Sequence, residues 1–173
     1  SLLLLSIPFV LLYFLFRGLR DQAYVQRWTE RFGYFPDQAE PGGILIHAAS
    51  VGEFNAASPL IKALIKNHPD LSITVTTLTP TGSARVKDEL GEKVAHGYIP
   101  IDLPWVMTSF LKQVQPSVII VMETEIWPNF YLAAQRMNIP LLMANARLSE
   151  RSVQRFSKLG QLVKDVLQTV NWI

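Results

Sequence analysis

The chain has 173 residues, of which 49% are hydrophobic and 17% are charged, and it contains no Cys. This length and composition predict one folded domain with a substantial core and exclude a disordered or collagen-like chain. The lack of Cys excludes disulfides, thiolate metal sites and Cys nucleophiles. The formal net charge is only +2 and no basic stripe is visible, so we expect no nucleic-acid binding.

The first segment resembles a membrane anchor. Residues 2–16 carry no charge, and Arg17, Arg20, Arg27 and Arg31 follow them. As a helix this run covers roughly 22 Å, less than the roughly 30 Å of a hydrocarbon core, and the first residue is not Met, so we expect preceding residues to complete one span. The alternative is a buried core helix, which is disfavoured because apolar residues cover every side. We predict an anchor helix over residues 1–20, with the arginines and the globular part on the cytoplasmic side.

From residue 43 onward, short apolar runs rich in β-formers alternate with helical segments. The predicted strands are residues 44–47, 72–76, 95–99, 117–122, 140–143 and, as the opening of a sixth, 170–173. The predicted helices are residues 54–67, 83–90, 104–113, 128–137 and 150–167. Because the strands are continuously apolar and alternate with helices, we predict an α/β fold, a Rossmann-like parallel sheet with helices on both faces.

The same reading divides the chain into three parts. Residues 1–20 form the anchor, residues 21–42 form a basic membrane-proximal helix and linker, and residues 43–173 form the Rossmann-like domain. In such folds ligands bind beyond the carboxyl ends of the strands, so the loops that follow the strands should carry the chemistry. Those loops are where the sequence becomes polar.

The first of these loops contains Ser50, Gly52 and Glu53. A carboxylate at this rim can accept a proton from a sugar hydroxyl, and the glycine lets a substrate approach the backbone. The alternative is a capping box, in which Glu53 bonds only the backbone N–H of Ser50. His47, inside the preceding strand, is expected to be a satisfied core histidine.

Glu123 and Glu125 end the most hydrophobic strand. If the extended backbone continues, a period of two places both on the same side. Burial of an acid is costly without compensation, so an acid at a strand end is a candidate functional group. Alternatively, Glu125 favours the positive end of the helix that begins near Pro128.

Two further loops combine hydroxyls, helix N-termini and guanidinium groups, which suit a carboxylate or phosphate. Thr81 and Gly82 with Arg85 form one, and Asn145 with Arg147 forms the other. Simple helix capping is the alternative for both. Neither loop is a Walker A motif, and no Gly-x-Gly-x-x-Gly follows the first strand, which counts against a dinucleotide-binding dehydrogenase.

Taken together, these segments resemble the family of 3-deoxy-D-manno-octulosonic acid (Kdo) transferases of lipopolysaccharide synthesis. The matching segments are IHAASVGEFN at 46–55, TTLTPTG at 76–82, PID at 100–102, ETEIWPN at 123–129 and NARLS at 145–149. The hydrophobic start and RWTERFG at 27–33 also fit the family's membrane-anchored N-terminus. The resemblance implies the N-terminal half of a GT-B glycosyltransferase, without the C-terminal donor domain.

The resemblance further implies an inverting transfer of Kdo from CMP-Kdo to the lipid A precursor at the cytoplasmic face of the inner membrane, with no cofactor and no metal. Glu53 matches the general base and Glu123 the second essential carboxylate. We expect the acceptor to contact the polar groups of the strand-end loops, and we expect this half alone to be inactive. The expected acceptor-binding residues are Ser50, Gly52, Thr81, Gly82, Arg85, Glu125, Asn145 and Arg147.

Two rival interpretations stay open at this point. One is a membrane-associated GT-B glycosyltransferase with a different donor. The other is a non-catalytic Rossmann-like membrane adaptor, in which Glu53 only caps a helix.

Overall fold

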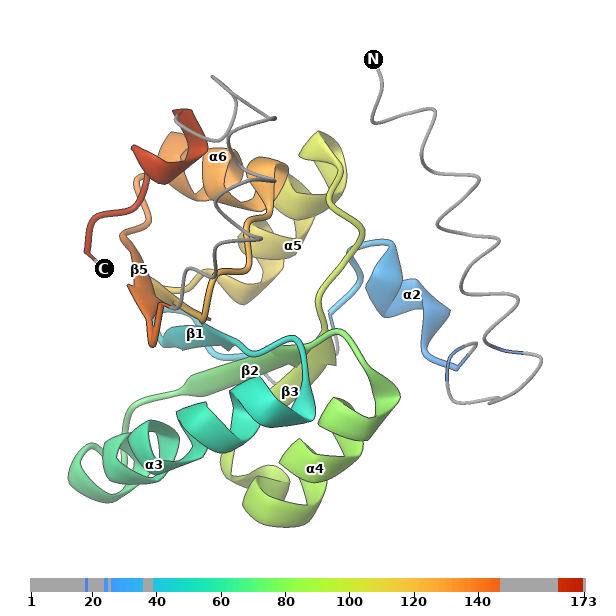
Figure 1. The fold of residues 1–173 in the computed structure, drawn as a ribbon, viewed down its shortest axis with the longest axis vertical. Helices are drawn as coiled ribbons and strands as arrows, with labels where there is room; N and C mark the ends of the chain where they lie inside the picture. The colour runs from blue at the N-terminus through green and yellow to red at the C-terminus, as the bar shows by residue number, and fades with distance from the viewer. Residues whose placement is uncertain (1–17, 19–23, 25, 36–38, 147–164, 173) are drawn as a thin grey trace.

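The computed structural model describes residues 18, 24, 26–35, 39–146 and 165–172 (Figure 1). At its centre lies a five-stranded parallel sheet in the order β3-β2-β1-β4-β5. The strands are β1 (Ile44–His47), β2 (Ile73–Thr77), β3 (Ala95–Tyr98), β4 (Val118–Met122) and β5 (Leu141–Ala144). The predicted α/β class with a parallel sheet is therefore confirmed.

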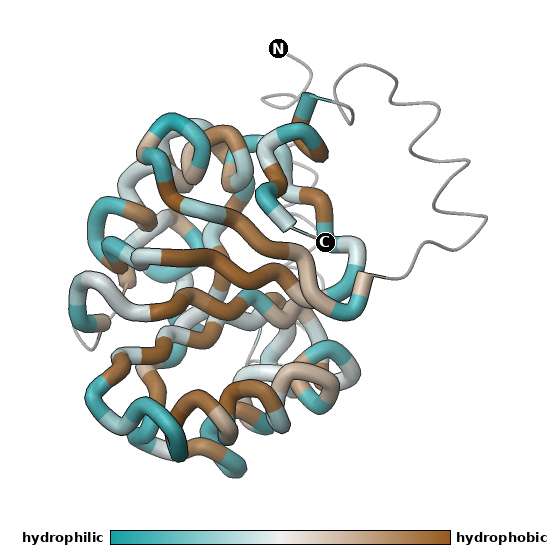
Figure 2. The backbone as a smooth tube through the Cα atoms, turned by 90° about the vertical axis from the view of Figure 1, so that its left-hand side faces the viewer, coloured by the Kyte–Doolittle hydropathy of each residue, from teal (hydrophilic) through white to brown (hydrophobic). Residues whose placement is uncertain are grey.

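Helices cover both faces of this sheet (Figure 1). One layer holds α3 (Val51–Asn67) and α4 (Pro80–Leu90), followed by the short 3-10 helix η2 (Gly91–Lys93). The opposite layer holds α5 (Pro104–Val114) and α6 (Pro128–Arg136). This arrangement accounts for strands that are apolar on both sides, because neighbouring residues such as Leu45 and Ile46 belong to different halves of the core. In Figure 2 the strands form the hydrophobic middle of the molecule.

Two helices begin three residues earlier than the sequence pattern predicts. Ser50 accepts a hydrogen bond from the Glu53 N–H (3.3 Å), and Thr79 accepts one from the Gly82 N–H (3.1 Å). These side chains replace the hydrogen bonds that the first turn of a helix lacks, so helix geometry extends back to the cap. The polar loops are consequently the first turns of α3 and α4 themselves.

The predicted sixth strand is seen at its start. Trp172 forms a parallel bridge with Leu142, and the Met143 N–H donates to the Trp172 carbonyl at 2.9 Å. A strand placed there lies beyond β5. The order thus becomes that of the doubly wound dinucleotide-binding fold, which matches the predicted Rossmann-like class.

The segment 26–35 packs against the outer edge of the sheet, where α2 (Trp28–Arg31) lies beside β3. Glu30 accepts the Tyr98 N–H at 2.8 Å and pairs with Arg27 at 2.5 Å. The guanidinium of Arg31 lies over the Tyr98 ring, 3.9 Å from its centroid, and donates to the Leu78 carbonyl at 2.6 Å. The segment 26–35 is thus attached to the sheet at β3, the edge strand, whose outer side pairs with no other strand of the described sheet.

Two predicted elements lie outside the described residues: the anchor helix, and all but the last turn of the helix at 150–167. Within the described ranges, no helix has both the length and the apolar character that a membrane crossing requires. The anchor over residues 1–20 therefore stays a prediction.

Gly97 in β3 provides a test of this packing. A Cβ there would lie inside van der Waals contact with the Phe35 ring, whose Cδ2 atom would be 2.8 Å away. We expect Gly97→Ala to lower the free energy of unfolding by about 1–3 kcal/mol, because the ring must shift in a packed core.

The matched control is Gly52→Ala, where the nearest atom to a new Cβ is Ser50 Oγ at 3.8 Å. Ala has the higher helix propensity, so this change should not reduce stability. Urea unfolding of the full-length protein measures both variants, and equal effects would contradict the proposed packing.

Candidate active site

The candidate site lies where the strand order reverses. β1 and β4 are neighbours in the sheet, but α3 follows β1 on one face and α6 follows β4 on the other (Figure 1). In folds of this class the ligand-binding crevice lies at such a point, beyond the carboxyl ends of the two strands. Glu53, Glu123 and Glu125 come from the two loops that border it.

Glu53 is a buried carboxylate held by groups of its own loop; its residue is only 7% exposed. One oxygen accepts the Ala49 N–H at 2.8 Å, and the other accepts the Ser50 hydroxyl at 2.9 Å. The expected capping-box bond to the Ser50 N–H is therefore replaced by a bond one residue earlier. Ser50 is nevertheless the N-cap of α3, so capping and a held carboxylate occur together.

The electrostatics of Glu53 favour its protonated form. Burial raises its pKa above the ordinary 4.5, and the negative charges of Glu125 and Glu123 raise it further. The hydrogen bonds from Ala49 and Ser50 act in the opposite direction. A carboxylate with a raised pKa is suited to accept a proton from a hydroxyl group near neutral pH.

Glu123 lies at a sharp turn rather than in an extended strand. β4 ends at Met122, and Glu123 has φ 56°, in the left-handed region. Its N–H donates to the Ala144 carbonyl at 2.8 Å, which fixes the turn against β5. The premise that placed Glu123 and Glu125 on one side by strand alternation is therefore wrong. Both acids still lie within electrostatic range of Glu53.

Glu125 is held by aromatic side chains, which the sequence did not reveal. Its carboxylate accepts the indole N–H of Trp127 at 3.0 Å, and its carbonyl accepts the Tyr131 hydroxyl at 2.7 Å. The alternative role of Glu125, as the anion at the start of α6, is taken by another residue. The carboxylate of Asp102 accepts the N–H groups of Asn129 at 3.1 Å and Phe130 at 2.9 Å.

Asp102 thus joins the loop after β3 to the first turn of α6. Burial raises the pKa of Asp102, while the two backbone N–H groups lower it. The side chain of Asn129 also donates to the Asp102 carbonyl at 2.7 Å. Both partners of this contact lie in segments singled out in the sequence, Asp102 in PID at 100–102 and Asn129 in ETEIWPN at 123–129, but no pattern predicted that they meet.

His47 is a core histidine that is only half satisfied. Its Nδ1 lies 3.0 Å from Thr76 Oγ1, the residue beside it in the strand register. Nε2 is buried and has no hydrogen-bond partner among the described residues. Burial lowers the pKa of His47 to about 4, so the ring is neutral at physiological pH.

The loop after β2 lies against the Glu53 loop, because the N–H groups of Leu78 and Thr79 both donate to the Ala49 carbonyl (3.0 and 3.3 Å). This contact brings Thr81 and Gly82, at the start of α4, to the same end of the sheet. Thr81 is exposed and Gly82 is buried.

The remaining predicted binding residues have different positions. Arg85 pairs with Glu89 at 2.6 Å and donates to Asn55 at 3.3 Å, on the surface shared by α3 and α4. Asn145 is exposed, with φ 55°, directly after β5. Arg147 lies outside the described residues.

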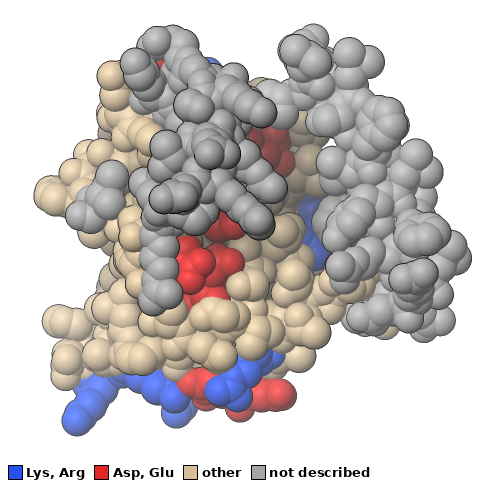
Figure 3. Space-filling view, in the orientation of Figure 1, with Lys and Arg blue, Asp and Glu red and all other residues tan. Residues whose placement is uncertain are grey.

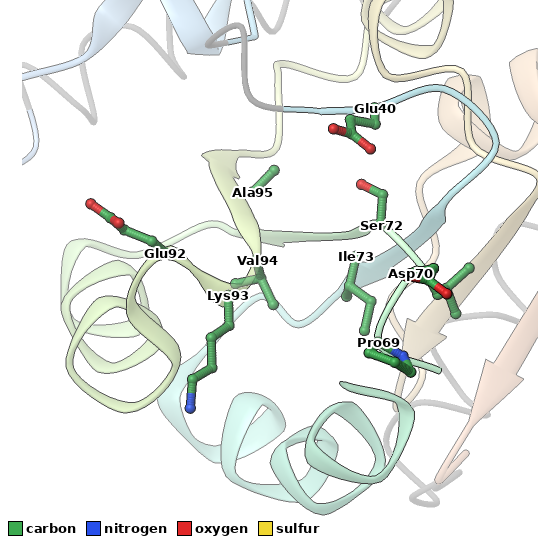
Figure 4. A pocket seen from close by; sticks show the side chains of 10 residues that line it. Glu40, Pro69, Asp70, Ser72, Ile73, Glu92, Lys93, Val94 and Ala95 are labelled. Carbon is green, nitrogen blue, oxygen red and sulfur yellow. The ribbon is translucent and has the colours of Figure 1, made fainter. Parts of the chain in front are cut away.

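Charged side chains are unevenly distributed over this face of the molecule, and at the bottom acidic and basic ones lie side by side (Figure 3). Acidic side chains gather in its middle, whereas most of the visible Lys and Arg lie over α3 and α4 at the bottom (Figure 3). A shallow hollow lined by Glu40, Asp70 and Lys93 lies at the amino ends of β2 and β3 (Figure 4). The candidate site lies at the other end of the strands. That hollow is thus separate from the switch-point site. The described residues include no group of three His, Asp or Glu that could hold a metal ion.

Comparison with known proteins agrees with this architecture. Residues 26–173 match the family described as 3-Deoxy-D-manno-octulosonic-acid transferase (kdotransferase). A 3-deoxy-D-manno-octulosonic acid transferase of Haemophilus influenzae is 47% identical over 98% of this chain and 39% of its own length. A probable mitochondrial one of Arabidopsis thaliana is 40% identical over 87% of this chain and 34% of its own length. One of Bordetella pertussis is 33% identical over 72% of this chain and 30% of its own length.

The fold and site define a Rossmann-like domain with carboxylates at its switch point. The chain belongs to the 3-deoxy-D-manno-octulosonic-acid transferase (kdotransferase) family. It spans 30% to 39% of the length of these curated relatives.

The raised pKa of Glu53 predicts a pH-dependent stability. Above 4.5 an unfolded chain releases this proton while the folded chain still binds it, so the free energy of unfolding falls as pH rises through the folded pKa. We expect Glu53→Gln to remove this loss. The stability of the variant relative to wild type should then increase as the pH rises above 4.5.

Urea unfolding at several pH values measures that difference. A constant difference over the whole range would show that Glu53 titrates alike in the folded and unfolded states.

Proposed function

We propose that this chain is the acceptor-binding half of an inverting GT-B glycosyltransferase that transfers Kdo from CMP-Kdo to the lipid A precursor. The observation that carries the proposal is Glu53, a buried carboxylate at the switch point with a raised pKa and two loop donors. Membership of the kdotransferase family supports the choice of the transferred sugar.

In the proposed reaction Glu53 is the general base. It accepts the proton of an acceptor hydroxyl, whose oxygen forms a bond to the anomeric carbon of Kdo. The bond from that carbon to the CMP phosphate breaks on the opposite side, and CMP leaves with the bonding electrons. One base on the acceptor side is what an inverting displacement requires.

Capping does not prevent this role. Each carboxylate oxygen of Glu53 accepts one hydrogen bond from its own loop, and an ionised carboxylate has about four acceptor positions. The Ala49 and Ser50 donors fix the orientation of the group, while Glu123 and Glu125 oppose its ionisation. Proton transfer from the acceptor is thereby favoured.

The proposed acceptor contacts come from the loops that meet at this end of the sheet. Exposed Gly52 and Thr81 lie at the starts of α3 and α4, whose N-termini suit phosphate oxygens. We propose that Ser50, Gly82, Glu125 and Asn145, which follow the strands at their carboxyl ends, complete the acceptor contacts. We propose Arg147 as the principal phosphate ligand, and Arg85 as a weaker one because its guanidinium already pairs with Glu89.

We further propose that the uncharged run at 2–16 anchors the protein in the inner membrane, with the catalytic part on the cytoplasmic face. The basic segment that follows is fixed to β3 through Glu30 and Arg31. This attachment would hold the crevice close to a lipid-linked acceptor.

Loss of the base tests the function. In the full-length protein, Glu53→Gln should reduce Kdo transfer by about 10²- to 10⁴-fold while CMP-Kdo binding stays near wild type, because the amide keeps the shape but loses the basicity. Release of CMP in the presence of tetra-acyl disaccharide acceptor measures the rate.

The matched control is Glu92→Gln, an exposed carboxylate of the short η2 helix, which precedes β3 and lies away from the carboxyl ends of the strands. It should retain wild-type transfer. Wild-type turnover in the Glu53 variant would leave Glu53 with its capping role alone.

The assignment of Arg147 has its own test. Arg147→Ala should raise the KM for the acceptor roughly 10- to 150-fold, the range of a charge-assisted contact, with a smaller effect on the KM for CMP-Kdo. Arg85→Ala should have a weaker effect. Kinetics with both substrates varied separate the roles: a defect confined to CMP-Kdo would move Arg147 to the donor side.

A further inference from the structure

We propose that Trp127 is a positioning residue whose indole N–H holds the Glu125 carboxylate at the crevice beside Glu53. The inference rests on the proposed function and assigns a role to a residue that the sequence did not single out. Three sets of contacts carry it.

The first is the hydrogen bond itself. Trp127 Nε1 lies 3.0 Å from Glu125 Oε2, two residues away in a loop that is neither helix nor strand. A carboxylate on a free loop has several staggered orientations, and a donor of fixed position selects one of them. A hydrogen bond to a charged group is also among the stronger kinds in proteins.

The second set fixes the indole ring. The His47 ring packs against Trp127 at 88° and 5.7 Å between centroids, and it also contacts Phe130 at 6.5 Å. His47 is in turn held by Thr76 at 3.0 Å and is neutral, so it carries no charge that would compete for Glu125. The ring therefore rests on a rigid part of the sheet rather than on the loop alone.

The third set fixes the backbone around Trp127 without using its N–H. Asp102 binds the first turn of α6, and Tyr131 donates to the Glu125 carbonyl. Loss of the indole N–H should consequently release the carboxylate of Glu125 while the loop and the helix stay in place.

The held carboxylate matters because of what it faces. The groups that act on the pKa of Glu53 are the Ala49 N–H, the Ser50 hydroxyl and the charges of Glu123 and Glu125. Of the two charges, that of Glu125 raises the pKa more. The orientation of Glu125 therefore contributes to the electric field at the base.

A double-mutant cycle in the full-length protein tests the inference. Trp127→Phe keeps the aromatic packing on His47 but removes the N–H, and Glu125→Ala removes the carboxylate. We expect Trp127→Phe to lower kcat/KM for Kdo transfer about 10-fold in the wild-type background and less than about 2-fold in the Glu125→Ala background, because the bond no longer exists there.

The matched control is Trp105→Phe, the same chemical change at an exposed position of α5, which should leave kcat/KM unchanged. Glu125→Asp approaches the contact from the other partner. It keeps the charge but moves it away from the indole N–H, so it should also lower kcat/KM for Kdo transfer. This test remains available if the Trp127 variant does not fold.

Each outcome is decisive. Equal losses from Trp127→Phe in both backgrounds, or wild-type activity in Glu125→Asp, would overturn the positioning role and leave Trp127 as packing. A full-length wild-type protein that does not transfer Kdo would instead refute the proposed function.

Discussion

The arrangement of the site depends on one contact, the pair of hydrogen bonds that hold the Glu53 carboxylate against Ala49 and Ser50. A buried acid is unfavourable unless its oxygens find donors, and here a strand end and a helix cap supply them within five residues. The Ala49 carbonyl in turn binds the loop that starts α4. One short segment therefore connects β1, α3 and α4, and it fixes a titratable group between them.

The opposite wall of the crevice is built from more distant parts of the chain. Asp102 reaches the first turn of α6. Trp127, whose ring packs on His47, and Tyr131 both donate hydrogen bonds to Glu125. The backbone carbonyl and the side chain of Glu125 are thus held by different partners. The two walls differ accordingly: the Glu53 side is local in sequence, whereas the Glu125 side requires that three strands are already assembled.

This difference decides what the sequence could predict. The strands followed from apolar runs, and Glu53 followed from its place between a strand and a cap, since both signals lie within a few residues. The apolar pattern predicted α3 only from residue 54, whereas the capping alternative, with Ser50 as the N-cap, corresponds to the observed start at Val51. Asp102 and Asn129 are 27 residues apart, so no local pattern linked them. The turn at Glu123 was also missed, because a left-handed residue other than Gly has a weak signature.

The contact between Glu30 and the Tyr98 N–H has a practical consequence for handling the protein. β3 is an edge strand, and an edge with free N–H groups is a template on which another molecule can add a strand. Here the Glu30 carboxylate accepts a hydrogen bond from one such N–H group, and Arg27 donates to the carbonyl of His96 on the same strand. A shortened version that starts after Phe35 would uncover this edge. Such a version would be prone to aggregate even though every residue of the switch-point crevice is still present.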